Sequence, residues 1–116
     1  MSITSALYTG VTGLQAMGNS IQVVGNNIAN SNTVGFKAMR ADFSDLLYQS
    51  LNTGGNSSQL GRGVQIETIS RHFAQGAFLN STSVTDMAIN GRGFFIVSDG
   101  NGSFYTRAGN FKTNSN

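Results

Sequence analysis

The first thirty residues carry a seven-residue repeat of apolar side chains and contain no charged residue. Branched aliphatic residues recur at intervals of seven: Leu7, Leu14, Ile21 and Ile28. A second, mixed row keeps the same interval: Ile3, Gly10, Met17 and Val24. The first charged side chain of either sign is that of Lys37. This spacing predicts a long helix with one apolar seam, and the missing charges indicate that other protein encloses it on more than one side.

The predicted helix is weak on its own. Four glycines fall inside it: Gly10, Gly13, Gly18 and Gly25. Each costs about 1 kcal/mol relative to alanine in a helix interior, so packing must stabilise the helix. Thirty helical residues reach about 45 Å, which is more than the remaining chain can cover. Because the sequence has no second long heptad segment, we expect the partner in another chain or in a part of the protein outside these 116 residues.

The segment after the helix predicts a change of structure. Asparagines at positions 26, 27, 30 and 32, followed by Gly35, are residues that tolerate the left-handed conformation found where helices end. Apolar residues between Phe36 and Leu51 have a spacing that predicts a second, shorter helix. The small polar residues at 52–63 predict a flexible linker or a surface loop.

From Val64 the apolar period changes to two, which is typical of strands. Alternation at 64–69 predicts one strand, and 88–90 and 94–97 predict two more, the last of them buried on both faces. The turn residues at 99–102 predict a hairpin that returns through 104–107.

These segments predict an α+β fold. It comprises a long N-terminal coiled-coil-type helix (1–33), a connector (34–63) and the beginning of a mainly antiparallel β domain (64–116). Because a fragment of two to four strands with open edges is marginally stable, we expect this β domain to be truncated at the C-terminus.

Composition argues against several classes of function. A net charge of +2 is too small for a dedicated nucleic-acid surface. The absence of cysteine excludes disulfides and zinc–thiolate sites, and the single His72 excludes a multi-histidine metal centre. The longest apolar run is the four residues 94–97, so no membrane insertion is expected.

Two patterns leave weaker alternatives open. Ser70 lies two residues before His72, but no carboxylate stands at a spacing that suggests catalysis. The Gly-Arg-Gly triplets at 61–63 and 91–93, together with eight phenylalanines, allow single-strand nucleic-acid binding by stacking, which the low net charge opposes. The second triplet precedes a predicted strand. Because a phosphate-binding loop follows its strand, a tight turn is the better interpretation.

Five short segments occur in a characteristic order. The first combines Gly-Asn-Asn-Ile-Ala-Asn at 25–30 with Thr-Val-Gly-Phe-Lys at 33–37, and the others lie at 61–66, 73–76, 86–95 and 105–111. In this order they resemble the bacterial flagellar rod and hook proteins over essentially the whole chain. The residues that carry the resemblance are Asn26, Asn27, Asn30, Thr33, Gly35, Phe36, Lys37, Asp86, Gly91, Gly93, Phe94, Phe95, Tyr105 and Arg107.

The resemblance implies a structural subunit with no reaction, no cofactor and no metal. In this family the N-terminal helix pairs with a C-terminal helix of the same subunit, which is absent from this sequence. The paired helices stack into a helical tube around the export channel. The residues implied to form the seam are Ile3, Leu7, Leu14, Met17, Ile21, Val24 and Ile28.

The resemblance also implies where the protein acts and with what. The hook, a flexible universal joint, is the first interpretation, and the distal rod is the alternative. The implied partners are identical subunits, rod and hook–filament junction proteins, and the flagellar type III export apparatus, with no nucleic acid. Export without a cleaved signal peptide is expected. The asparagines and Lys37 would shape the helix end and a partly extended connector over 36–63.

Overall fold

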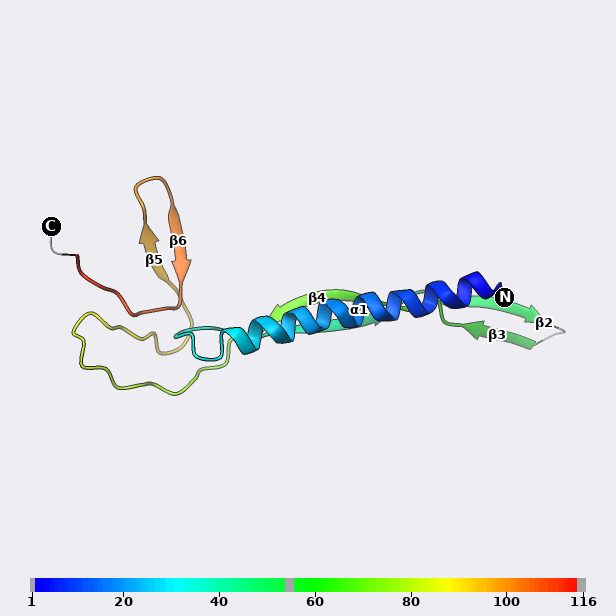
Figure 1. The fold of residues 1–116 in the computed structure, drawn as a ribbon, viewed down its shortest axis with the longest axis horizontal. Helices are drawn as coiled ribbons and strands as arrows, with labels where there is room; N and C mark the ends of the chain where they lie inside the picture. The colour runs from blue at the N-terminus through cyan, green and yellow to red at the C-terminus, as the bar shows by residue number, and fades with distance from the viewer. Residues whose placement is uncertain (1, 54–55, 115–116) are drawn as a thin grey trace. The chain divides into compact units, whose positions relative to one another are not determined.

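A computed structural model describes residues 2–53 and 56–114. Helix α1 spans Ile3–Ala29 (Figure 1). The strands in the described part of the chain are β1 (Met39–Asp45), β2 (Gln49–Thr53), β3 (Asn56–Leu60), β4 (Val64–Arg71), β5 (Phe95–Ser98) and β6 (Ser103–Thr106). They form the antiparallel pairs β1–β4, β2–β3 and β5–β6. The predicted α+β class, with a long N-terminal helix followed by antiparallel strands, is confirmed.

The chain divides into two compact units. The first combines Met1–Ile28 with Met39–Arg71, and the second combines Ala29–Ala38 with His72–Asn116. In the first unit α1 runs along the β1–β4 ribbon (Figure 1).

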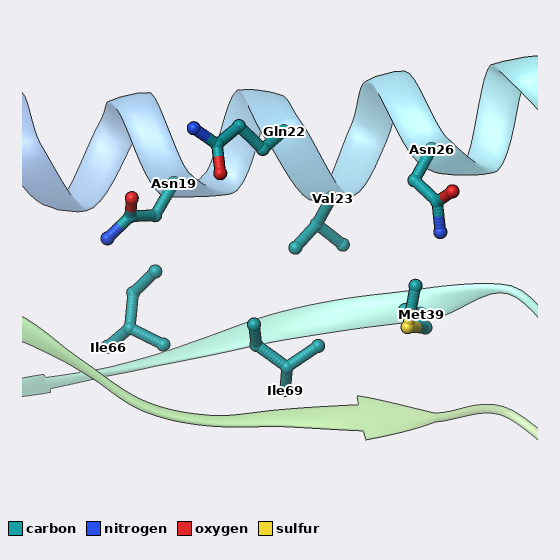
Figure 2. A pocket seen from close by; sticks show the side chains of 7 residues that line it. All are labelled: Asn19, Gln22, Val23, Asn26, Met39, Ile66 and Ile69. Atoms are coloured by element: carbon teal, nitrogen blue, oxygen red, sulfur yellow. The ribbon is translucent and has the colours of Figure 1, made fainter.

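The β1–β4 ribbon contains a bulge that sets which side chains face the helix. Asp42 lies opposite Thr68, but the next residue, Phe43, lies opposite Ile66, so Glu67 is left over. The bulge brings Ile66 and Ile69 to the same face, toward α1 (Figure 2). Simple alternation over 64–69 places these two isoleucines on opposite faces. That detail of the prediction is wrong because of the extra residue.

The predicted helix over 36–51 is wrong. The structure places β1 and β2 there, because β4 and β3 supply hydrogen-bonding partners for them. Long-range pairing overrides the local apolar spacing. The predicted flexible linker is wrong over Asn56–Leu60, which forms β3 opposite β2. Positions 54 and 55 of that linker lie outside the described residues.

Helix α1 ends inside the asparagine cluster, as predicted, but no asparagine among the described residues takes the left-handed conformation that was expected to end it. The helix ends at Ala29, and two turns follow in which Thr33 N–H donates to the Asn30 carbonyl at 3.0 Å and Phe36 N–H donates to the Thr33 carbonyl at 3.2 Å. Gly35 has a φ of +73°, a conformation that favours glycine.

The second unit contains the predicted hairpin. β5 and β6 pair from Phe95–Thr106 to Ser98–Ser103, and Asp99 N–H closes the turn on the Gly102 carbonyl at 3.1 Å. The prediction that 94–97 is buried on both faces is wrong, because the Ile96 side chain is 68% exposed on this two-stranded sheet. The predicted strand at 88–90 is also absent. Instead, the adjacent residue Met87 donates its N–H to the Gly109 carbonyl at 2.9 Å.

Burial in the first unit involves small side chains. The buried apolar residues of the described chain are Ala16 and Val23, at 4% and 8% exposure, and both lie on α1. In the described residues, no helix combines the length and hydropathy needed to cross a bilayer.

Candidate assembly surface

The side of α1 that faces the ribbon is built from small and polar residues. They recur every three or four positions and are at least half-buried: Ser5, Thr9, Thr12, Ala16, Ser20, Val23 and Asn27. Residues with this spacing share one face of a helix. The helix therefore contacts its own ribbon through a face that an apolar pattern does not reveal.

The large apolar side chains of α1 lie away from that contact. We call them the aliphatic stripe, and their exposure ranges from 51% at Val24 to 79% at Ile3: Ile3, Leu7, Leu14, Met17, Ile21, Val24 and Ile28. Leu14 and Ile21 each precede a buried residue, Ala16 and Val23, by two positions, which corresponds to about 200° around a helix. The stripe is thus uncovered along most of α1.

A continuous apolar stripe of this length has the physical character of a contact surface. Exposed patches of large apolar residues mark interaction sites on soluble proteins, whereas single exposed residues are common. The stripe contains no titratable or hydrogen-bonding side chain. What it can do chemically is exclude water from an apolar partner.

Thr12 joins the helix to the ribbon near the N-terminal half of α1. Val64 N–H donates to Thr12 Oγ1 at 3.4 Å, and the Thr12 hydroxyl donates to the Thr9 carbonyl at 2.8 Å. Gly63 has a φ of +113°, and a Cβ at this position would overlap the Thr12 hydroxyl. Only glycine lets the ribbon approach the helix this closely.

Asn27 makes the corresponding contact near the C-terminal end of α1. Its Nδ2 donates to the Met39 carbonyl at 2.7 Å, and the Met39 N–H donates to its Oδ1 at 2.9 Å. The side-chain amide therefore pairs with both backbone groups of the first residue of β1.

Between these two contacts lies an open cavity of about 390 Å³. Figure 2 shows Val23 pointing from α1 toward the ribbon, and Met39, Ile66 and Ile69 pointing from the ribbon toward α1. The amides of three further helix residues complete the lining: Asn19, Gln22 and Asn26. The ribbon face that meets α1 is thus apolar, although the helix face opposite it is largely polar.

The other motif residues of the helix end lie in the second unit. Thr33 Oγ1 donates to Asn30 Oδ1 at 3.1 Å. Gly35 lies so close to the Arg107 carbonyl that a Cβ would overlap it. Lys37 Nζ donates to the Ala74 carbonyl at 2.7 Å, and Phe36 is half-buried. These residues hold the segment after α1 against later parts of the chain.

Arg107 organises the predicted tight turn at 91–93. Its Nη1 donates to the carbonyls of Gly91 at 2.9 Å and Gly93 at 2.8 Å. Both glycines have positive φ, +94° and +134°. The triplet forms a bend whose carbonyls accept from the guanidinium, and no helix follows it in the described chain.

Most of the remaining motif residues make contacts elsewhere in the second unit. Phe94 meets Phe73 edge-to-face at 6.0 Å, and Phe95 meets Phe111 in the same way at 5.4 Å. Asp86 accepts a hydrogen bond from the Ser81 hydroxyl. The Tyr105 side chain remains exposed on β6. The motif residues of the second unit therefore shape its fold.

The catalytic and metal-binding alternatives find no support in the described residues. The Ser70 hydroxyl donates its proton to Asp42 Oδ2 at 2.9 Å. His72 donates its backbone N–H to the Ala38 carbonyl, and its side chain is exposed. In the described part of the chain, no three metal-binding side chains gather.

Sequence reasoning missed three residues that position these features. Thr12 and Met39 make the two helix–ribbon contacts, and no periodic pattern distinguishes them. Gly109 is buried against the Met87 carbonyl, where a Cβ would overlap the oxygen. The sequence did offer a signal for Gly109, because this glycine lies within the segment at 105–111 that carries part of the family resemblance.

A long helix that turns its aliphatic stripe away from its own ribbon offers a candidate surface for contact with other protein. The comparisons with known proteins give the family of the chain. A profile described as "Flagella basal body rod protein" matches residues 7–37, and one described as "Flagellar hook protein FlgE/F/G D1 domain" matches residues 88–116. The chain belongs to the bacterial flagellar rod and hook family.

Curated relatives include both kinds of flagellar protein. The flagellar hook protein FlgE of Borreliella burgdorferi is 42% identical over 95% of this chain, and that of Rhizobium meliloti is 44% identical over 96%. The flagellar basal-body rod protein FlgG of Caulobacter vibrioides is 41% identical over 94%. The chain spans 27% of both hook proteins and 46% of this rod protein. These relatives place the chain in the bacterial flagellum.

Proposed function

We propose that the chain is a structural subunit of the flagellar hook, which assembles into a helical tube around an export channel. The observation that carries the proposal is the aliphatic stripe of α1, uncovered by the chain's own ribbon. Such a tube works as a flexible universal joint that transmits torque from the rod to the filament. Its action is mechanical and requires no reaction and no cofactor.

The stripe is proposed to pack against the C-terminal helix of the full-length chain and against identical subunits. Burying a large aliphatic side chain contributes about 1.5–3 kcal/mol. Several such residues together offset the roughly 4 kcal/mol by which four glycines weaken the helix. Assembly therefore supplies the stabilisation that α1 lacks. The segment 34–63, which contains β1, β2 and β3, would connect the assembly helix to the β domain that begins at 64.

The nature of the helix–ribbon contact supports a joint that bends. Between Thr12 and Asn27, the half-buried face of α1 carries the short side chains of Ala16 and Ser20, and an open cavity lies beside Val23. Short side chains interlock less than long ones, so the helix and the ribbon can flex between the anchors at Thr12 and Asn27, which keep the rotation and axial position of α1. A bending tube needs contacts of this kind.

The distal rod is the second candidate. The rod proteins among the relatives reach identities of 38–42%, which overlap the 40–44% of the hook proteins. The profile that matches residues 7–37 is also described as a rod protein. In either assembly the proposed partners are rod and hook–filament junction proteins and the flagellar type III export apparatus.

The proposal is tested with Leu14→Asp in the full chain, because this substitution places a carboxylate in the middle of the stripe. We expect polymer formation, followed by electron microscopy, to be abolished. Gln15→Asp adds the same charge to the neighbouring exposed residue outside the stripe, and it should still assemble. Normal polymers from Leu14→Asp would contradict the proposed surface.

The form of the wild-type polymer separates the two candidates. A hook subunit should give curved tubes of variable shape, whereas a rod subunit should give straight, rigid ones. Straight tubes alone would exclude the hook and favour the distal rod.

A further inference from the structure

We propose that Asn27 is a positioning residue that sets the rotation of α1 on the β1–β4 ribbon. This rotation keeps the aliphatic stripe available for assembly. The inference rests on the proposed function, because it takes the stripe to be the assembly surface.

Apolar contact alone does not select the observed rotation. The ribbon face beneath α1 presents Met39, Ile66 and Ile69 (Figure 2). Hydrophobic burial is not directional, so the aliphatic stripe would also be stabilised by lying on this face. In that arrangement the stripe would be covered by the chain's own ribbon and lost to a partner. Something other than apolar burial must hold Val23 inward and Val24 outward.

The hydrogen bonds of the Asn27 amide are directional and select one rotation of α1. A carboxamide carries one acceptor and one donor side by side, which match the N–H and C=O of a single residue. Both bonds to Met39 are formed, at 2.9 and 2.7 Å. A rotation of α1 that brought Ile28 over the ribbon would carry Asn27 away from Met39 and break both bonds.

Thr12 provides a second anchor of the same kind. It accepts the Val64 N–H at 3.4 Å and lies directly against Gly63. Fifteen residues separate Thr12 from Asn27, a distance of about 22 Å along a helix. Two directional contacts this far apart fix both the rotation and the axial position of α1. A single polar residue specifies register in the same way in coiled coils, at modest energetic cost.

The test measures the rotation directly. The chain has no cysteine, so reporter pairs can be introduced without background. Val23→Cys with Ile69→Cys reports the observed rotation, because both positions line the cavity (Figure 2). Val24→Cys with Ile69→Cys reports a rotated helix, because Val24 belongs to the stripe. A short bis-maleimide reagent joins whichever pair comes close, and the yields are compared in the full chain.

Asn27→Asp is introduced into each reporter pair. The carboxylate can still accept the Met39 N–H, but it cannot donate to the Met39 carbonyl and repels that oxygen, so the polar preference for the observed rotation is weakened. We expect the yield ratio to change about tenfold in favour of the Val24 pair, the effect of losing one or two hydrogen bonds. Polymer formation should fall in the same variant. Asn19→Asp, the same change at an exposed residue lining the same cavity, should leave the ratio unchanged.

A second variant keeps the test decisive if Asn27→Asp folds poorly. Thr12→Val keeps the branched shape of the side chain but removes the acceptor for Val64, and should shift the ratio in the same direction by a smaller factor. An unchanged ratio in both variants would overturn the proposal. Equal loss of both cross-links in both variants would show that these residues only stabilise the unit, which also overturns it.

Failure of the proposed function has a different signature. If Leu14→Asp assembles normally, the stripe is not the assembly surface, whatever the cross-links show. If Leu14→Asp blocks assembly while Asn27→Asp leaves the ratio unchanged, the surface stands and the positioning role of Asn27 fails.

Discussion

The two faces of α1 are built from opposite kinds of residue. The face on the ribbon consists of small and polar side chains held at Thr12 and Asn27 by hydrogen bonds. The outward face carries the aliphatic stripe. A surface helix of an ordinary domain places its apolar residues toward its own core. We propose that the apolar pattern of α1 serves contacts outside the described chain, while polar groups set the contact within it.

The largest effect is expected from adding one carboxylate to each face in turn. Ala16→Asp buries a charge at a side chain that is 4% exposed, and should destabilise the first unit by roughly 2–4 kcal/mol. Leu14→Asp, two residues away, should leave the thermal stability of the free subunit nearly unchanged while blocking assembly. Thermal unfolding followed by circular dichroism measures the difference. Equal destabilisation by the two substitutions would remove the distinction between the faces.

Replacing two glycines, one beside the ribbon and one on the exposed side of α1, is expected to change stability by smaller amounts of opposite sign. Gly63→Ala forces a Cβ against Thr12 at a φ of +113° and should cost about 2 kcal/mol. Gly18→Ala meets open space on the helix and should stabilise α1 by about 1 kcal/mol. Unfolding of both variants in denaturant checks the signs. A stabilising Gly63→Ala would mean that the ribbon does not approach the helix at this point.

The solvent side of the ribbon should contribute little. Arg40 Nε lies 2.8 Å from Asp42 Oδ1, but the arginine side chain is largely exposed, so Arg40→Ala should cost less than about 0.5 kcal/mol. Asp42→Asn also weakens the hydrogen bond from Ser70 and should cost more. A double-mutant cycle measures the coupling. A large coupling would show that the outer face of the ribbon stabilises the unit more than the helix contact does.

The smallest effect concerns a single titration. A hydrogen bond to Asp45, followed by the negative charge of that carboxylate, raises the pKa of Tyr48 above its ordinary value of 10.0. The stabilisation that the Tyr48–Asp45 hydrogen bond gives to the folded state is therefore present at neutral pH, and it is lost as the pH rises through the raised pKa of Tyr48. Asp45→Asn should bring the pKa of Tyr48 back toward 10.0, which a pH titration by NMR detects. No change would mean that the two side chains do not meet in solution.

Local sequence signals were sufficient where structure is set by nearby residues. The heptad predicted α1, the asparagines and Gly35 predicted its end, and the turn residues at 99–102 predicted the β5–β6 hairpin. Each of these elements is specified within a few residues by backbone preference or by apolar spacing.

The sequence-based predictions of secondary structure failed where pairing with a distant segment of the chain determines the local structure. The stretch after Phe36 has helical spacing, yet it pairs with β4 and β3, which local spacing does not reveal. The bulge at Glu67 likewise depends on the register with β1. The seam remains a prediction, since its expected partner lies outside the described chain. The polar contacts of Thr12 and Asn27 were missed because polar residues on a helix normally face water.

Oxidation of Met17 measures whether assembly buries the aliphatic stripe. Met17 belongs to the stripe and is 57% exposed in the described chain, so hydrogen peroxide should convert it readily to the sulfoxide in the free subunit. Peptide mass spectrometry then compares the rate in the free subunit with the rate in assembled polymer. Burial of the stripe by neighbouring helices predicts strong protection of Met17 in the polymer. Oxidation of Met17 at the same rate in both forms would contradict the account.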